Sequence, residues 1–231
     1  MKAKLKRLAL WVTLLAIALP LTVIVAYRFF APPITPLMII RLAEGEGWDY
    51  RWVPLTDISP HLVRAVMAAE DARFCEHFGF DFNALSYELD EWLEGERPRG
   101  ASTISQQTAK NILLWPGRGL LRKGLEAWLT PQVELVWSKH RIFEVYLNVI
   151  EVAPGIYGAE AGAQRLFGTS AARLSPGEAA RLAAVLPNPR GRSAVQPSQR
   201  VQGRANLIER RARAMDGLDR LCRGLIVRQP S

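Results

Sequence analysis

The first long pattern in the chain is an uncharged apolar run from Leu8 to Tyr27, preceded by basic residues at positions 2, 4, 6 and 7. A helix of about 20 residues spans about 30 Å, the thickness of a bilayer's hydrocarbon core. A cleavable signal peptide is the alternative, but its apolar core is normally about 7–15 residues long and is followed by small residues. Here the run ends in the aromatic and basic cluster Tyr27–Phe30. We therefore expect a transmembrane helix over residues 8–30.

The basic residues 1–7 form a cytoplasmic tail under the positive-inside rule, so the rest of the chain lies outside the cytoplasmic membrane. Residues 31–58 have the pattern of a linker and extended arm. Prolines near its start favour extended backbone, and a loose alternation of aromatic and polar residues from Glu44 to Pro54 indicates a short strand. Strand signals are few from residue 59 onward. The sequence thus predicts a mainly α-helical domain over residues 59–231.

Start signals and apolar spacing divide this domain into helices. Ser59-Pro60 is an N-cap followed by a first-turn proline, and Ser175 to Glu178 is a capping sequence. Pro131 is tolerated in the first turn of a helix, so a new helix is expected to begin there. Residues 150–158 are predicted as a loop. The expected helices cover residues 60–70, 81–93, 102–114, 121–130, 131–149, 159–167 and 175–186.

The last predicted helix has one apolar face and one basic face. Its apolar residues recur at spacings of three, four and seven, which predicts a buried face. These residues are Val201, Ile208, Ala212, Met215, Leu218 and Cys222. The arginines on the other face are Arg200, Arg204, Arg210, Arg211, Arg213 and Arg220. A solvated surface is the simpler explanation of that face, and contact with the membrane is the alternative.

Charge and cysteine content narrow the choice of partners. The net charge is +8, yet the chain has no nucleic-acid-binding motif and its domain is expected outside the cytoplasm. Anionic lipid headgroups and a pyrophosphate-bearing substrate fit this charge better. Cys75 and Cys222 lie in an oxidising compartment, where either one disulfide or two half-buried thiols are compatible with the sequence. Their wide spacing argues against a metal or redox motif.

The first candidate for chemistry is Glu70. Val63, Met67, Glu70 and Phe74 fall on one helical stripe, so the carboxylate lies in line with apolar neighbours. Burial there raises the pKa of a glutamate and makes it a better proton acceptor. The alternative is a helix-end glutamate that turns into solvent. His77 is read as a structural histidine bonded to a nearby carboxylate or carbonyl, since three scattered histidines do not predict zinc.

Two further polar clusters follow. Gly100 to Asn111 places hydroxyl residues at a helix start, where free N–H groups attract anions. One face of that helix carries Thr103, Gln107, Lys110 and Asn111. The alternative is an N-cap with an exposed polar face. Arg122, Lys123 and Glu126 come next, and Arg122 with Glu126 is by itself a simple i,i+4 salt bridge.

Taken in order, these segments resemble the family 51 glycosyltransferases, the peptidoglycan glycosyltransferase domain of class A penicillin-binding proteins and monofunctional transglycosylases. The matching patterns begin at Glu70, Gly100, Arg122 and Lys139. They read E-D-x-x-F-x-x-H-x-G, G-x-S-T-I-x-Q-Q-x-x-K-N, R-K-x-x-E and K-x-x-I-x-E-x-Y-L-N. The resemblance extends from about Ser59 to Pro189. The S-x-x-K and K-T-G signatures of a transpeptidase are absent from this sequence, which favours the monofunctional type.

The resemblance implies a fold, a reaction and a set of site residues. The fold is a lysozyme-like helical domain with a membrane-proximal lobe; Phe82 to Gly100 is the candidate lobe, and an amphipathic core helix is the alternative. The reaction polymerises lipid II into β-1,4-linked glycan by inverting transfer from a polyprenyl-pyrophosphate donor. Glu70 is the implied general base and Glu126 the second carboxylate. The implied substrate-binding residues are Ser102, Gln107, Lys110, Asn111 and Arg122. Asp71 is an implied ligand for Mg²⁺ or Mn²⁺, which some relatives use.

The implied partners are lipid II, the growing lipid-linked glycan, membrane lipids, and proteins of cell-wall synthesis or division; no nucleic acid is expected. The implied location is the inner membrane, crossed once with the catalytic domain in the periplasm, and the implied role is in cell shape. A lysozyme or lytic transglycosylase, with Glu70 as general acid, is the main rival. Lys110 and Arg122 argue against it, because cleavage of a neutral glycan has little use for paired cations. An inactive scaffold is disfavoured by the presence of both Glu70 and Glu126.

Overall fold

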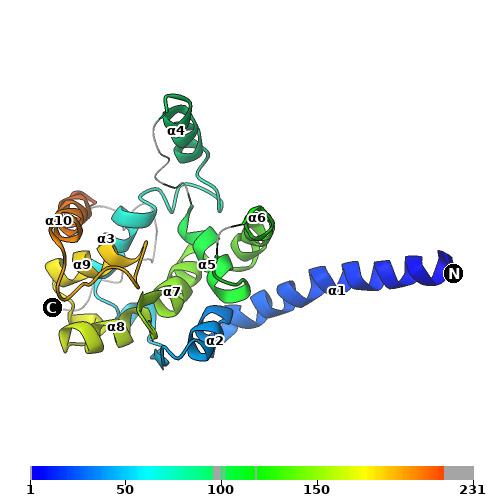
Figure 1. Cartoon of the computed structure of the whole chain (residues 1–231), viewed down its shortest axis with the longest axis horizontal. Helices are drawn as coiled ribbons and strands as arrows, with labels where there is room; N and C mark the ends of the chain where they lie inside the picture. Colours follow the sequence, from blue (N-terminus) through cyan, green and yellow to red (C-terminus); the bar gives the residue numbers. More distant parts are fainter. Residues whose placement is uncertain (1, 96–99, 101, 118, 216–231) are drawn as a thin grey trace.

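The chain folds into a helical body from which one long helix and one short lobe project (Figure 1). The computed structural model describes residues 2–95, 100, 102–117 and 119–215. In these residues the helices are accompanied by a small sheet of order β1-β3-β2, in which β1 (Asp49–Tyr50) is parallel to β3 (Ile156–Tyr157) and β2 (Glu151–Ala153) is antiparallel to it. The mainly α-helical fold class predicted from the sequence is confirmed.

The core lies where α3 (Pro60–Glu70), α5 (Ile104–Leu113) and α7 (Lys139–Val149) meet their neighbours. Helix α3 packs on α9 (Pro176–Val185) and α10 (Gln199–Ala214), while α5 packs on α7 and on α6 (Leu120–Val136). Apolar residues at i, i+3 and i+4 spacing supply this core, and the largest fully buried side chains include Met67, Phe74, Ile104, Phe143 and Tyr146. Each contributes about 1.5–3 kcal/mol by burial. The remaining elements are α8 (Gly158–Phe167) and the 3₁₀ turns Leu55–Asp57 and Ala171–Arg173.

Most of the predicted helix starts are confirmed by their caps. Ser59 accepts a hydrogen bond from the backbone of His61, and Ser175 forms a capping box with Glu178. Helix α5 begins later than the predicted residue 102, because Thr103 and Gln106 cap each other reciprocally. In α10, the buried residues are Val201, Ala205, Ile208 and Ala212, which confirms its apolar face as far as Ala214. Leu218, Arg220 and Cys222 lie outside the described residues.

The predicted break at Pro131 is wrong. Helix α6 continues through Pro131 to Val136, and the break falls at Trp137-Ser138. Proline inside a helix costs about 3 kcal/mol because it lacks an N–H donor. Burial of Leu129 and Val133 on the two sides of the proline offsets that cost. Ser138 supplies the true start signal, since its hydroxyl accepts a hydrogen bond from the backbone of Arg141.

Two elements in predicted loops were missed. Helix α2 (Pro36–Ala43) lies inside the segment predicted as linker, with Thr35 accepting from the Met38 backbone as its N-cap. This start resembles Ser59-Pro60, but the helix is too short to be stable without tertiary contact. Strands β2 and β3 form a hairpin where a loop was predicted. Gly155 makes its turn with a φ of +67°, and a Cβ there would lie 2.0 Å from the Glu46 carbonyl oxygen. The predicted short strand near Glu44 to Pro54 is confirmed as β1.

Helix α1 (Lys2–Phe29) is fixed to the body at its C-terminal end. The Trp137 indole donates to the Ile24 carbonyl at 2.7 Å, and Arg141 donates to the carbonyls of Tyr27 and Phe30 at 2.8 and 2.6 Å. The bonds from Arg141 satisfy carbonyls at a helix end that otherwise lack partners. From there α1 extends away from the body (Figure 1). Among the residues that the structure describes, no helix combines the length and the apolar character needed to cross a membrane.

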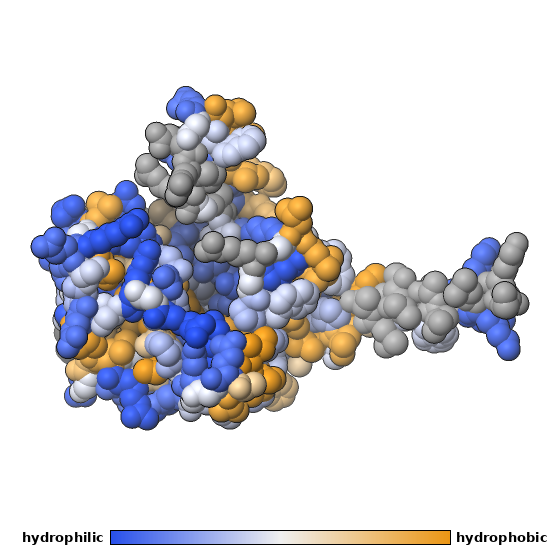
Figure 2. Space-filling model, viewed as in Figure 1, coloured by the Kyte–Doolittle hydropathy of each residue, from blue (hydrophilic) through white to orange (hydrophobic). Residues whose placement is uncertain are grey.

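Helix α4 (Phe82–Leu93) forms the projecting lobe (Figure 1). Asp81 caps its start through the backbone N–H groups of Asn83 and Ala84. None of its residues is buried, so the alternative reading of an amphipathic core helix is wrong. Figure 2 shows apolar surface on this projecting part. The exposed apolar residues of α4 are Phe82, Leu85, Tyr87, Leu89, Trp92 and Leu93. Cys75 precedes this lobe and is not a free thiol.

Two glycines inside helices distinguish the effect of packing on stability from the effect of helix propensity. Replacing glycine by alanine inside a helix gains about 0.5–1 kcal/mol where the added methyl meets nothing. At Gly203 in α10 a Cβ has no neighbour within 4 Å, so Gly203→Ala should stabilise the protein by about that amount. At Gly162 in α8 the Cβ would lie 2.9 Å from the Cγ2 of the buried, β-branched Val152. Gly162→Ala should therefore destabilise by about 1–3 kcal/mol. Denaturant unfolding of the two variants measures both values, and equal signs would contradict the packing.

Candidate active site

The end of α3, the loop after it, α5 and the start of α6 bring most of the predicted site residues together. Glu70 is the last residue of α3, and its side chain is 11% exposed. The amide nitrogen of Gln107 donates to Glu70 Oε2 at 3.1 Å. Tyr146, on α7, donates its hydroxyl to the amide oxygen of Gln107 at 3.1 Å. This tyrosine sets the direction of the Gln107 amide, so that the donor end faces the carboxylate.

Burial favours the neutral form of Glu70, and its neighbours partly oppose that effect. Burial raises the pKa of Glu70, while the hydrogen bond from Gln107 and the charges of Arg204, Lys110 and Arg192 act in the opposite direction. A glutamate with a raised pKa is a stronger base than a solvated one. The alternative of a glutamate that turns into solvent is therefore wrong, and the predicted burial of Glu70 is confirmed.

The second carboxylate, Glu126, lies in a cluster of cations on α5 and α6. Its side chain is 4% exposed; Arg122 donates to one oxygen at 2.8 Å, and Lys123 contacts the other. Lys123 also donates to the Ser102 hydroxyl at 2.9 Å. Burial lowers the pKa of Lys110, and so do Arg122 and Lys123, whereas Glu126 and Glu70 raise it. Three cations around one carboxylate leave positive charge available for an anion.

Glu70 and the cation cluster share one groove. A hollow of about 280 Å³ is lined by residues that include Glu70, Asp71, Asp81 and Ser102. A smaller hollow of about 160 Å³ shares Asp81 and Ser102 with it and reaches Lys123. The groove thus runs from the buried glutamate to Lys123. Gln107, Lys110, Asn111 and Arg122 are not among the residues that line these hollows.

Those four residues differ in how they are joined to the groove. Gln107 contacts Glu70 directly, and Arg122 reaches the groove through Glu126, whose other partner Lys123 lines the smaller hollow. Lys110 lies one turn after Gln107 on α5, close enough to Glu70 for the charge of each to shift the pKa of the other. Asn111 is buried on the same helix, and its side chain makes no hydrogen bond to a groove residue in the described part of the chain.

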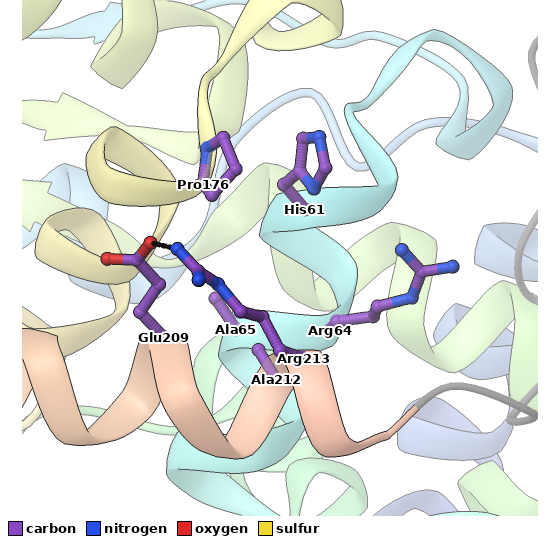
Figure 3. Close-up of a pocket in the computed structure, with 7 residues that line it drawn as sticks. All are labelled: His61, Arg64, Ala65, Pro176, Glu209, Ala212 and Arg213. Carbon is purple, nitrogen blue, oxygen red and sulfur yellow. Dashed lines mark hydrogen bonds and ion pairs between the residues drawn. The ribbon is translucent and has the colours of Figure 1, made fainter.

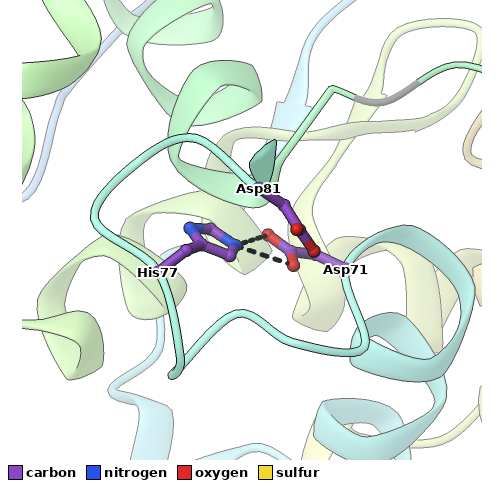
Figure 4. Close-up of side chains that lie close together, drawn as sticks. All are labelled: Asp71, His77 and Asp81. Atoms are coloured by element: carbon purple, nitrogen blue, oxygen red, sulfur yellow. Dashed lines mark hydrogen bonds and ion pairs between the residues drawn. The ribbon is translucent and has the colours of Figure 1, made fainter. Parts of the chain in front are cut away.

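Asp71 forms a compact cluster with His77 and Asp81 (Figure 4). One ligand atom from each lies within 4.8 Å of the others, as a metal site requires. The Asp71 carboxylate already accepts from His77 Nε2 at 3.0 Å and from the backbone of Ile104 at 3.0 Å. The Oδ1 atom of Asp81 accepts both capping bonds of α4. A divalent cation would have to displace some of these hydrogen bonds, and His77 already has the structural role predicted for it.

Several functional candidates were missed by the sequence reasoning. Lys123 stands in the recognised R-K-x-x-E pattern, yet only its neighbours Arg122 and Glu126 were assigned. Tyr146 stands in the fourth pattern, and its contact with Gln107 depends on how α7 packs against α5. Arg204 was assigned to a solvated or membrane-facing surface, but its guanidinium lies 3.5 Å from Glu70. The sequence carries no signal for that contact, because 134 residues separate the two.

A separate hollow of about 400 Å³ lies between α3 and α10 (Figure 3). Its lining includes His61, Arg64 and Pro176 together with Glu209 and Arg213, which pair with each other. None of the predicted site residues lines it. The groove at Glu70 is therefore the better candidate for the active site.

Comparison with known proteins gives consistent matches. The profile of the family described as Transglycosylase matches residues 39–213. A biosynthetic peptidoglycan transglycosylase of Caulobacter vibrioides is 52% identical over 216 residues, which is 93% of this chain and 94% of that protein. A protein of the same name from Rhodospirillum centenum is 57% identical over 188 residues, covering 81% of each chain. The one from Agrobacterium fabrum is 52% identical over 207 residues, covering 89% of this chain and 92% of the relative.

If the cation cluster binds an anion, inorganic pyrophosphate should raise the unfolding temperature of the protein. A ligand that binds only the folded state at 100 times its Kd adds about 2.7 kcal/mol of stability. Lys123→Met removes a cation that lines the groove and should reduce the shift. Arg165→Met is the matched control, since Arg165 pairs with Asp49 on the exposed surface and should leave the shift unchanged. Thermal scans with and without pyrophosphate measure this, and an equal shift in both variants would contradict an anion site in the groove.

Proposed function

Because this chain belongs to the transglycosylase family, we propose that its groove joins lipid-linked disaccharides into glycan. In this proposal Glu70 is the base, and the cations of α5 and α6 bind the anionic leaving group. It is a peptidoglycan glycosyltransferase. The proposed substrates are lipid II as acceptor and the growing glycan on polyprenyl pyrophosphate as donor. The proposed product is a β-1,4-linked strand.

The single observation that carries this proposal is that the groove has a buried carboxylate at one end and a cation at the other. One end holds a buried carboxylate whose directly bonded partner on α5 is the neutral amide of Gln107. The other end is lined by Lys123, which together with Arg122 is bonded to Glu126 behind it. A base and a fixed positive cluster on one path match a reaction in which an alcohol attacks and an anion departs.

The chemical step follows from that placement. Glu70 accepts the proton of the acceptor sugar hydroxyl, and the oxygen forms a bond to the anomeric carbon of the donor. The bond from that carbon to the pyrophosphate oxygen breaks, and its electron pair leaves with the polyprenyl pyrophosphate. Lys110, Arg122 and Lys123 stabilise the charge on this leaving group, and Glu126 holds two of these cations in place. Attack opposite the leaving group inverts the anomeric carbon.

A glycan-cleaving reaction fits the groove less well. The leaving group in that reaction is a sugar alcohol, which needs a carboxylic acid to protonate it. The second carboxylate here, Glu126, has both of its oxygens engaged by cations, Arg122 on one and Lys123 on the other, so it is not placed to donate a proton to a leaving group. The same cations suit a leaving group that carries its own negative charge.

We further propose that the enzyme is anchored in the inner membrane by α1, with the catalytic domain in the periplasm. The uncharged run from Leu8 to Tyr27 and the basic residues before it support this topology. The exposed apolar residues of α4 support a lobe in contact with lipid. An anchor confines the groove to the plane in which lipid-linked substrates diffuse and raises their effective concentration. Release of the protein from membranes by alkaline carbonate would contradict the anchor.

A divalent metal at Asp71 is a further proposal, separate from the chemical step. Its carboxylate is engaged by His77 and Ile104, so no step of the reaction above is assigned to a metal. Activity that survives removal of divalent cations by a chelator would remove the metal from the proposal. Ser102 and Asn111 stay proposed substrate-binding residues, and partner proteins of cell-wall synthesis stay proposed partners.

Purified protein with lipid II in detergent tests the proposed function. The wild type should form long glycan that a muramidase digests, whereas Glu70→Gln should lose about 10²–10⁴-fold in rate because a general base is removed. Glu209→Gln is the matched control, since Glu209 pairs with Arg213 outside the groove. Short sugars released from finished peptidoglycan, in place of new glycan, would establish the hydrolase reading.

The pH dependence of the same assay tests the role of Glu70. The base acts only when ionised, so kcat/KM should fall as the pH drops through the Glu70 pKa, which burial places above that of an ordinary glutamate. Gln107→Leu removes a donor that favours the ionised form. The acid limb should therefore move to higher pH in that variant. An acid limb that stays in place would mean that another group titrates.

A further inference from the structure

Glu70 is also approached from the side opposite α5, by arginines that the reaction above does not use. Arg204 on α10 places its Nη2 atom 3.5 Å from Glu70 Oε1. Arg192, in the segment between α9 and α10, acts on the same carboxylate through its charge, while its own Nη1 donates to the Ala184 carbonyl at 2.9 Å. Arg204 is thus the arginine whose side chain reaches the carboxylate.

The guanidinium of Arg204 is only partly engaged. Its Nε is buried and has no hydrogen-bond partner in the described part of the chain, although the side chain as a whole is 38% exposed. A buried donor without a partner costs about 1–3 kcal/mol. The 3.5 Å contact between Arg204 and Glu70 is at the long limit of a hydrogen bond, so it offsets little of that cost. Stability of the free protein therefore does not account for an arginine at this position.

The position of Arg204 is set by its helix. Val201, Ala205 and Ile208 are buried on the apolar face of α10, and α10 packs against α3, which ends at Glu70. A guanidinium fork matches a carboxylate with two parallel donors, here Nη2 and the unpartnered Nε. Contacts at catalytic groups are often long in the free enzyme and shorten when substrate is bound.

We propose that Arg204 is a positioning residue for the transfer reaction, holding Oε1 of Glu70 while Gln107 holds Oε2. This inference rests on the proposed function. With one donor on each oxygen, the plane of the carboxylate is fixed, and each oxygen keeps a lone pair that can accept the substrate proton. The orientation of the base is then determined jointly by α5 and α10, two elements on opposite sides of it.

The other groups that face Glu70 do not supply this orientation. Lys110 on α5 and Arg192 act on it by charge without a hydrogen bond in the described residues, and Tyr146 on α7 reaches it through Gln107. Asp71, the next residue, is turned to His77 and Ile104. Arg204 and Gln107 are the groups in the described residues that make hydrogen bonds to the carboxylate.

The test compares variants of the full chain in the lipid II assay, with kcat and KM measured separately. Arg204→Ala should lower kcat about 10–100-fold, the range expected when a catalytic group is misplaced, while KM stays within about 3-fold. Low concentrations of guanidinium ion should restore part of the rate in Arg204→Ala. Arg204→Lys keeps the charge but loses the fork, so it should show an intermediate kcat. Arg213→Ala, on the same helix and paired with Glu209, is the matched control and should keep wild-type kcat and show no response to guanidinium.

Each outcome decides the proposal. A kcat within about 2-fold of wild type in Arg204→Ala, or a loss confined to KM, would overturn it. A fall in unfolding temperature without rescue by guanidinium would assign Arg204 a structural role instead, and the folded Arg204→Lys variant would then have wild-type kcat. A wild-type protein that makes no glycan from lipid II would refute the proposed function itself, which is a separate result.

Discussion

A carboxylate cannot be buried in this fold without a partner, and the active-site groove is arranged around that constraint. Moving a charge out of water costs several kcal/mol unless hydrogen bonds or opposite charges compensate it. Glu70, Asp71, Glu126 and Glu134 all lie in the body with little exposure, and each has hydrogen-bonding or charged partners. Their partners come from α5, α6, α7, α10 and the loop after α3. The same contacts that make burial tolerable therefore hold these elements in register.

The kind of partner decides what each carboxylate can do. Glu126 is bound by Arg122 and Lys123, so it fixes these two cations near the groove. Glu70 has a neutral amide on one oxygen and a distant guanidinium on the other, so burial still raises its pKa. In the proposed reaction the two glutamates therefore take opposite roles, one as a base and one as a support for positive charge. The asymmetry is a property of their neighbours and not of the glutamates.

The two projecting parts, α1 and α4, are packed less than the body. Helix α1 is bound to the body near its C-terminal end, where Trp137 and Arg141 donate to backbone carbonyls, and no residue of α4 is buried. Both leave apolar surface exposed, in contrast to the closely packed α5 and α7. Their apolar side chains are available to a lipid phase that the proposed function supplies.

The sequence by itself determined the helical class, most helix starts and the four segments that carry the family's pattern. Caps such as Ser59, Thr103 and Ser175 are local, since a side chain there bonds a backbone group within three residues. The polar stripe of α5 is local too, because helical periodicity places Gln107 and Lys110 on neighbouring turns. These features need no knowledge of the rest of the chain.

Only the tertiary structure decided the rest. Helix α6 continues through Pro131 because burial on both sides of the proline outweighs a lost hydrogen bond. Helix α2 is too short to form alone and depends on tertiary contacts. The tertiary structure also set Arg204 beside Glu70 and Tyr146 beside Gln107, across long separations in the sequence. Such contacts depend on how whole helices pack. Packing energy is summed over many residues, so no single stretch of sequence contains it.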